Sequence, residues 1–127
     1  MHYLRRVPYN QVPVWLNASD VLLLTSLHEG SPTIIKEALA CNVPVVSVDV
    51  GDVRERIKEI QGCYLALPDP NELAGKLCLV YSGARRVAGH LKMQEFSLQR
   101  IALQLKMLYE EVLLSWRGEA SLLKKVL

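Results

Sequence analysis

One stretch of the chain limits the folds open to it more than any other. An apolar run at residues 21–24 is followed by a turn at Gly30, a segment of helical character, and a second apolar run at residues 43–48. Short apolar runs are typical of strands that are buried on both faces of a parallel sheet. Asn42 can take the left-handed conformation that ends many helices, and Pro44 cannot continue a helix. We therefore predict a βαβ unit with a glycine turn at the start of its helix.

The start of this predicted helix has the features of an anion site. Ser31 is a favourable N-cap residue, and Pro32 suits the first helical position, because a residue there needs no N–H. The first turn of a helix leaves backbone N–H groups unpaired, and the helix dipole adds about half a positive charge. Phosphate groups bind at such helix ends, and Gly30 has no Cβ to keep a ligand from the backbone. We therefore predict a phosphate site at this turn.

Two glutamates flank the predicted phosphate site. Glu37 lies about 7.5 Å along the helix axis from Pro32, at about 1.5 Å per residue. A ribose attached to a diphosphate at the helix end would lie near that height, and one carboxylate can accept hydrogen bonds from two of its hydroxyls. Glu29 precedes the turn, on the side where the sugar of a donor would lie. Glutamates in and around a short amphipathic helix are most often only solvated, so this pair alone is weak evidence.

The order of residues around these glutamates resembles a known donor-site signature. Glu29, seven residues, Glu37 and then Ala-Leu-Ala-Cys-Asn-Val-Pro-Val-Val at residues 38–46 are similar to the signature of retaining nucleotide-sugar glycosyltransferases. These enzymes have the B-type (GT-B) fold and form the large group 1, or family 4, of glycosyl transferases. The resemblance continues through residues 48–51 and 67–74. It implies an α/β fold, with a Rossmann-like parallel sheet and flanking helices that form the C-terminal part of a GT-B donor domain.

The resemblance also implies a reaction and a role for each site residue. The reaction is transfer of a hexosyl group from a nucleoside diphosphate sugar with retention at the anomeric carbon. Glu29 would contact the donor sugar and is the candidate catalytic residue, while Glu37 would bind the ribose hydroxyls. The residues expected to bind the donor nucleotide are Gly30, Ser31, Pro32, Thr33, Ile34 and Glu37. We expect no metal and no other cofactor, because the helix end would hold the phosphates and the sequence has no clustered metal-ligand pattern.

Enzymes of the resembled family have an N-terminal acceptor domain and a C-terminal donor domain, and they are much longer than this chain of 127 residues. We assign residues 1–116 to a partial nucleotide-sugar binding domain and residues 117–127 to a C-terminal tail. The acceptor domain and the first donor strands are expected to be missing, together with the basic residues that clamp the diphosphate. We therefore expect the isolated chain to be weak or inactive, because no cleft would close over the sugar.

The expected partners are the nucleoside diphosphate sugar and an acceptor domain, or a chain that supplies it. Two alternatives to a transferase fragment stay open: a non-catalytic nucleotide-sugar binding or regulatory domain, and one half of a split enzyme. Exposed apolar edges would also suit a homodimer. The net charge of +2, from 15 basic and 13 acidic residues, gives no support for nucleic acid as a partner.

The cysteines, the apolar segments and the C-terminal residues of the chain are used to predict where the protein is located. The three cysteines, Cys41, Cys63 and Cys78, lie in predicted apolar elements and are expected to be reduced core residues of a cytosolic protein. No signal peptide or membrane-spanning segment is visible, which predicts a cytoplasmic protein, or one at most peripheral to the inner face of the membrane. Residues 120–127 are weakly amphipathic, and a frayed end is favoured over contact with a membrane surface.

Three further residues are predicted to cap helices. Asp52 stands where the resembled family often has a second glycine; it supplies an N-cap for a helix to about residue 59 and can tighten the loop near the site. Asp69, followed by Pro70, starts a helix to about residue 81. Ser97 caps a long final helix with an apolar face. The other predicted elements are a strand at residues 63–67 and a helical segment at residues 85–95.

Overall fold

The structure is a computed structural model that describes residues 5–83 and 85–126, with side chains as far as residue 116. The chain divides into two compact units, Met1–Met93 and Gln94–Leu127. The elements of the first unit are η1 (Tyr9–Gln11), α1 (Val12–Asn17), β1 (Leu22–Leu24), α2 (Thr33–Ala40), β2 (Val45–Val48), α3 (Val53–Ile57), β3 (Tyr64–Ala66), α4 (Pro70–Ser82) and α5 (Gly89–Met93). Those of the second unit are η2 (Gln94–Phe96) and α6 (Leu98–Val126).

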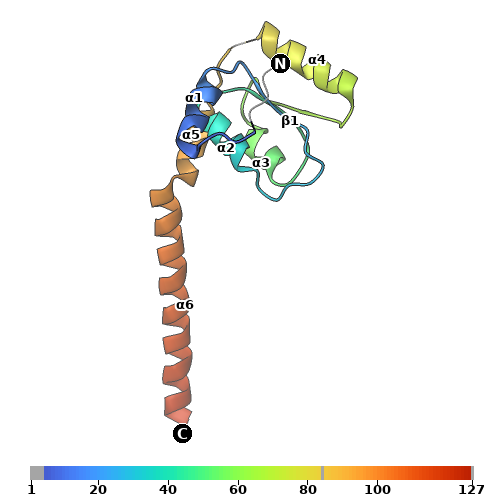
Figure 1. Ribbon diagram of the computed structural model, residues 1–127. Coiled ribbons are helices and arrows are strands. Elements are labelled where there is room, and N and C mark those ends of the chain that lie inside the picture. Colours follow the sequence, from blue (N-terminus) through green and yellow to red (C-terminus); the bar gives the residue numbers. More distant parts are fainter. Residues whose placement is uncertain (1–4, 84, 127) are drawn as a thin grey trace. The chain divides into compact units, whose positions relative to one another are not determined.

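The three strands of the first unit form a parallel sheet in the order β1-β2-β3, and its helices α1 to α5 are labelled in Figure 1. Leu22 is in register with Val45, and Val46 is in register with Tyr64. This parallel sheet with flanking helices confirms the predicted α/β fold. The strands are shorter than the apolar runs that predicted them. Pro44, for example, is buried but lies outside β2, because it has no N–H to donate to the sheet.

The helix α2 is held firmly against the centre of this unit. All four residues of β2 are buried, and α2 turns Ile35, Ala38 and Leu39 inward at the spacing of one helical face. Helix α2 also contacts α1, α3 and α5. The backbone of α5 comes so close that a Cβ on Gly89 would lie 2.6 Å from the carbonyl oxygen of Leu39. The N-terminus of α2 therefore projects from a rigid part of the fold.

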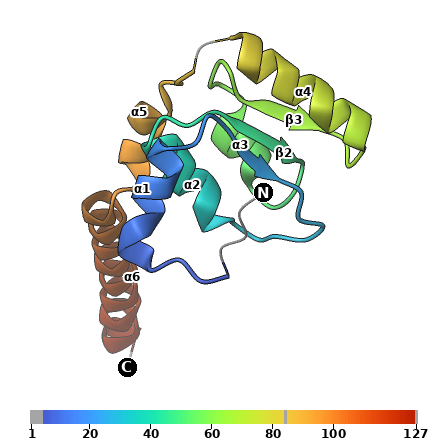
Figure 2. The ribbon, with the colours of Figure 1, turned by 45° about the horizontal axis from the view of Figure 1, so that its top comes forward.

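One face of the sheet is only partly covered. Leu23, Val46 and Tyr64 lie opposite one another across the three strands and so share a face. Helix α4 packs on β3 and β2 at this face (Figure 2). The side chain of Leu23 stays 43% exposed. The coverage by α4 therefore stops before β1, which is an edge strand within the described residues.

Several predicted helix ends are confirmed. Asn42 has a left-handed conformation, with φ of 58°, directly after α2. One carboxylate oxygen of Asp69 accepts hydrogen bonds of 3.0 Å from the N–H groups of Asn71 and Glu72 at the start of α4. The hydroxyl of Ser97 accepts a longer bond, 3.4 Å, from the N–H of Arg100. The helical segment predicted for residues 85–95 is shorter than expected and consists of α5 and η2.

The predicted start of α2 is wrong by one residue. Thr33 is its first residue, and Pro32 is an extended N-cap with φ of −64° and ψ of 116°. Ser31 does not cap the helix, because its hydroxyl donates to the carboxylate of Asp52. Asp52 stands at the N-cap position of α3, as predicted, but its side chain caps no N–H group. The carboxylate of Asp52 accepts from Ser31 and Arg56 instead.

Other predictions concern the end of the chain and the cysteines. Helix α6 continues to Val126, and the boundary between domain and tail at residue 116 stays a prediction. The side chains behind the amphipathic character of residues 120–127 lie outside the described part. Cys41 and Cys63 are half-buried, but Cys78 is exposed, because α4 buries only Val80 fully. Within residues 5–83 and 85–126, no helix is both long enough and apolar enough to cross a membrane.

Candidate functional site

Two loops meet at the carboxyl edge of the sheet. One joins β1 to α2 and contains Glu29, Gly30 and Ser31, and the other joins β2 to α3 and contains Gly51 and Asp52. Since β1 and β2 are neighbouring parallel strands, their carboxyl ends lie at the same edge. Open α/β sheets bind their ligands at this edge. The residues predicted to bind a donor therefore lie where this fold class places ligands.

The two loops are joined closely through their backbones. The N–H of Asp52 donates to the carbonyl oxygen of Gly30 at 3.1 Å. Gly51 has φ of +54°, and a Cβ there would lie 2.2 Å from the oxygen of Gly30 and 2.8 Å from that of Glu29. Glycine is thus required at position 51 for two reasons, its left-handed conformation and the close approach of the neighbouring loop.

This contact orients the peptide groups of the turn before α2. In a trans peptide, the C=O and the N–H point in opposite directions. Because the carbonyl groups of Glu29 and Gly30 face Gly51 and Asp52, the N–H groups of the next residues point away from that loop. In the turn before α2 and the first turn of that helix, the backbone N–H groups of four residues find no acceptor among the described residues: Gly30, Ser31, Thr33 and Ile34.

These free N–H groups lie at the end of an eight-residue helix, an arrangement that suits an anion. The dipole of α2 adds positive potential at the same place. A Cβ on Gly30 would meet nothing within 4 Å, so the surface over the turn is open. Pro32 is buried and has no N–H, so its contribution here is the shape of the turn and not a hydrogen bond.

The two predicted glutamates lie on either side of the start of α2. Glu29 is exposed in the loop, and Glu37 is half-buried on α2, about 6 Å along the axis from Thr33. Within the described part of the chain, neither carboxylate has a hydrogen-bond or ion-pair partner. Both are therefore available to a ligand.

Asp52 forms a cluster that the sequence analysis did not find. Its Oδ2 accepts from the Ser31 hydroxyl at 2.6 Å and from Nε and Nη2 of Arg56 at 2.9 and 2.6 Å. Burial would raise the pKa of Asp52, but the bonds from Ser31 and Arg56 and the charges of Arg56 and Lys36 outweigh it, and the pKa is lowered. Its other oxygen, Oδ1, is buried with no partner among the described residues. The four-residue spacing of Asp52 and Arg56 was the available signal.

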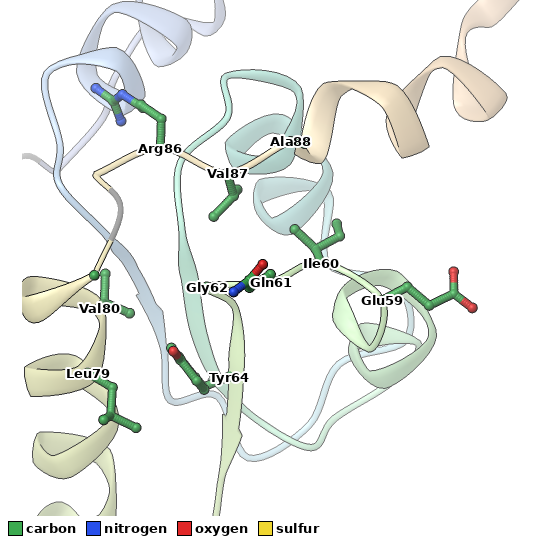
Figure 3. Close-up of a pocket in the computed structure, with 11 residues that line it drawn as sticks. Glu59, Ile60, Gln61, Gly62, Tyr64, Leu79, Val80, Arg86, Val87 and Ala88 are labelled. Atoms are coloured by element: carbon green, nitrogen blue, oxygen red, sulfur yellow. The ribbon is translucent and has the colours of Figure 1, made fainter.

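The largest cavities lie at the opposite, amino edge of the sheet. One of about 490 Å³ lies beside Gly62 and Tyr64 of β3 and the end of α4 (Figure 3). A second, of about 800 Å³, lies between the start of β1 and α4. Arg86 lines the first cavity, but its guanidinium is already bound to the carbonyl oxygens of Asn17 and Ser19. No group of three or more potential metal-ligating side chains gathers in the described residues.

Comparisons with known proteins agree with the fold described above. A model of the family described as glycosyl transferases group 1 matches residues 1–82. The chain is 50% identical, over 48 residues, to a Bacillus subtilis (strain 168) protein named, provisionally, as the teichuronic acid biosynthesis glycosyltransferase TuaC. The match covers 38% of this chain and 12% of TuaC. Sucrose-phosphate synthase from Thermosynechococcus elongatus is similar in structure, with a TM-score of 0.81 and 25% identity, over 90% of this chain. The chain spans 30% of that synthase.

Proposed function

Because this chain belongs to the glycosyl transferases group 1 family, we propose that it forms the donor-binding part of a glycosyltransferase. The donor would be a nucleoside diphosphate sugar, and the reaction would transfer its hexosyl group with retention at the anomeric carbon. The observation that carries this proposal is the set of unpartnered N–H groups before α2, which Gly51 and Asp52 orient at the carboxyl edge of the sheet. Such a set suits a diphosphate better than any other group of the donor.

Each site residue has a role in this proposal. The diphosphate accepts hydrogen bonds from the N–H groups of Gly30 and Ser31 and from the first turn of α2. Glu37 accepts hydrogen bonds from the ribose hydroxyls, and Glu29 contacts the sugar. When the bond between the anomeric carbon and the diphosphate oxygen breaks, negative charge develops on the leaving diphosphate. Fixed N–H groups and the helix dipole stabilise that charge more than they stabilise the intact donor, which lowers the barrier.

The free side of the sheet supports a role as part of a larger protein. Among the described residues, β1 pairs only with β2, and Leu23 on β1 is 43% exposed. The cavity of about 800 Å³ beside it is lined by Val21 and by residues of α4 such as Leu77 and Tyr81. An unpaired strand edge beside an apolar hollow suits an added strand and helix. We propose that the rest of the donor sheet packs there, and that the isolated chain is weak or inactive without the acceptor side.

The same edge also suits the second candidate, a donor-binding domain or half-enzyme that a separate chain completes. The chain matches 12% of the length of TuaC and 30% of that of the synthase. A second copy bound at β1 would form the homodimer that the sequence analysis allowed. Size-exclusion chromatography with light scattering separates these cases, because a homodimer doubles the mass without any other protein.

Calorimetric titration with UDP, GDP and their hexose conjugates tests the proposal. We expect the wild-type chain to bind one nucleotide series, and Glu37→Ala to weaken that binding by about tenfold, or about 1.4 kcal/mol. The matched control is Glu59→Ala, which removes an exposed glutamate beside the cavity at the amino edge of the sheet. Its affinity for the nucleotide should equal that of the wild type.

Two results would contradict the proposal. Loss of binding in Glu59→Ala with normal binding in Glu37→Ala would move the ligand to the amino edge. Absence of binding to the wild-type chain at millimolar nucleotide would mean that this part of the protein does not carry the donor site by itself. A third result, transfer of sugar by the purified chain in a single-turnover assay, would refute only the expected lack of activity.

A further inference from the structure

Asp52 holds two consecutive residues of the turn before α2, one through its backbone and the other through its side chain. We propose that Asp52 is a positioning residue for the donor diphosphate: its carboxylate holds the Ser31 hydroxyl and so keeps the N–H groups of the turn facing the ligand. This inference rests on the function proposed above. Asp52 would not contact the donor itself and would act through Ser31.

The geometry of the two contacts fixes the peptide between Gly30 and Ser31. The carbonyl of this peptide accepts from the N–H of Asp52 at 3.1 Å, and the side chain that follows it donates to Oδ2 of Asp52 at 2.6 Å. A bond of that length to a carboxylate is strong, because the acceptor is charged. Rotation of the peptide would break its bond to the N–H of Asp52, and the side-chain bond holds the Ser31 end of the peptide in place, so the Ser31 N–H stays directed away from the Asp52 loop.

The turn needs such a restraint because its own residues supply little. Gly30 has no side chain, and its surroundings are open, with nothing within 4 Å of a Cβ position. An unrestrained glycine peptide can rotate and turn its carbonyl oxygen toward the ligand, where it would repel a phosphate. Holding the peptide before the ligand arrives removes the entropic cost of ordering it on binding.

The charges around Asp52 make this arrangement compatible with an anion site. A lone carboxylate near a diphosphate would weaken binding by repulsion. Arg56 makes two hydrogen bonds to the same oxygen that Ser31 contacts, and the charge of Lys36 also acts on Asp52. The hydrogen bonds from Ser31 and Arg56 converge on Oδ2, while Oδ1 is buried without a partner among the described residues. The carboxylate of Asp52 is thus turned so that Oδ2 bonds to Ser31, although Oδ1 then has no partner in the described part of the chain.

A double-mutant cycle on nucleotide affinity tests the role of Asp52. We expect Ser31→Ala and Asp52→Ala each to weaken the binding of UDP or GDP by about fivefold to tenfold. The double variant should bind no more weakly than either single variant, because both changes break the same link. Ser31→Thr keeps a hydroxyl that can reach Asp52 and should bind more tightly than Ser31→Ala.

Asp49→Ala is the matched control, since Asp49 lies on the same loop and pairs with Arg54 through Nε at 3.0 Å, but does not contact the turn. Its affinity should stay within about twofold of the wild type. Amide order parameters from nuclear magnetic resonance should fall at Gly30 and Ser31 in Asp52→Ala, and not in Asp49→Ala. Lower thermal stability in Asp52→Ala with unchanged affinity and unchanged order parameters would overturn the inference.

The outcomes also separate this inference from the proposed function. If the wild-type chain binds the nucleotide and Asp52→Ala binds it equally well, only the role of Asp52 is refuted. Independent, additive losses in the two single variants would mean that Ser31 contacts the ligand directly, which also contradicts the inference. If the wild-type chain binds neither UDP nor GDP, the proposed function fails, and the role of Asp52 in it fails too.

Discussion

The polar groups at the two edges of the sheet differ in whether they have hydrogen-bond partners within the protein. At the amino edge lie two cavities, of about 490 and 800 Å³, and two of the polar side chains at that edge already have partners within the protein. Arg86 is bound to the carbonyl oxygens of Asn17 and Ser19, and Asn42 accepts from the N–H of His90. At the carboxyl edge, the turn before α2 leaves the N–H groups of Gly30, Ser31, Thr33 and Ile34 without acceptors among the described residues.

This difference favours the carboxyl edge over the two cavities as the place where a ligand would bind. A ligand gains most from polar groups that have no partner in the free protein, because forming the new bond breaks no internal one. The cavities at the amino edge are spaces between helices and strands, whereas the carboxyl edge presents oriented and unsatisfied donors. The comparison therefore predicts that changes at the carboxyl edge alter ligand binding and changes at the amino edge alter stability.

The largest effect should come from Gly51→Ala. The new Cβ would lie 2.2 Å from the oxygen of Gly30, in a backbone conformation with φ of +54° that alanine disfavours. The two loops would have to separate, so we expect a loss of about 3 kcal/mol in the free energy of unfolding and loss of measurable nucleotide binding. Urea denaturation and calorimetry measure the two effects.

Gly30→Ala is the control for this prediction. Its Cβ would meet nothing within 4 Å, so the fold should keep its stability. The added methyl group would still hinder the approach of a phosphate to the turn, and binding should weaken severalfold. Normal stability in Gly51→Ala would contradict the close contact of the two loops, and normal binding in Gly30→Ala would place the phosphate elsewhere.

A smaller effect is expected for Arg86→Ala at the amino edge. This change removes the bonds of 2.5 and 2.9 Å to the carbonyl oxygens of Asn17 and Ser19, which hold the segment after α4 to the end of α1. We expect the free energy of unfolding to fall by about 1 kcal/mol, with nucleotide affinity unchanged. Arg85→Ala, an exposed neighbour, should change neither quantity. A fall in affinity for Arg86→Ala alone would refute the division of roles between the two edges.

The sequence predicted those features that depend on neighbouring residues. Asn42 ends α2 in the left-handed conformation, and Asp69 caps α4 through the next two N–H groups, as local rules require. The apolar runs located β1 and β2, because the strands of a parallel sheet that helices cover are mostly apolar. The glycine turn and its free N–H groups followed from the same local pattern.

The errors arose where a partner is distant in the chain. Ser31 has the properties of an N-cap residue, but its hydroxyl bonds to Asp52, 21 residues later. Position 52 likewise satisfied the rule for an N-cap, and only the packing of the two loops shows that its carboxylate is used elsewhere. The bonds of Arg86 span 67 and 69 residues. Rules that use only neighbouring residues cannot predict such long-range hydrogen bonds, because each residue by itself also fits a local role.

The smallest expected effect is a pH dependence that arises from Asp52. Bonds from Ser31 and Arg56 lower the pKa of this carboxyl group in the folded protein. Its contribution to stability is therefore present above the unfolded pKa of about 3.9 and is lost as the pH falls through the lower folded value. The difference in unfolding free energy between the wild type and Asp52→Asn should be on the order of 1 kcal/mol or less at pH 7. It should shrink below about pH 4 in urea titrations, because protonation then removes the charge from the wild type as well. A difference that grows as the pH falls would mean that the carboxylate is destabilising in its place, and that the link between the two loops rests on their backbones alone.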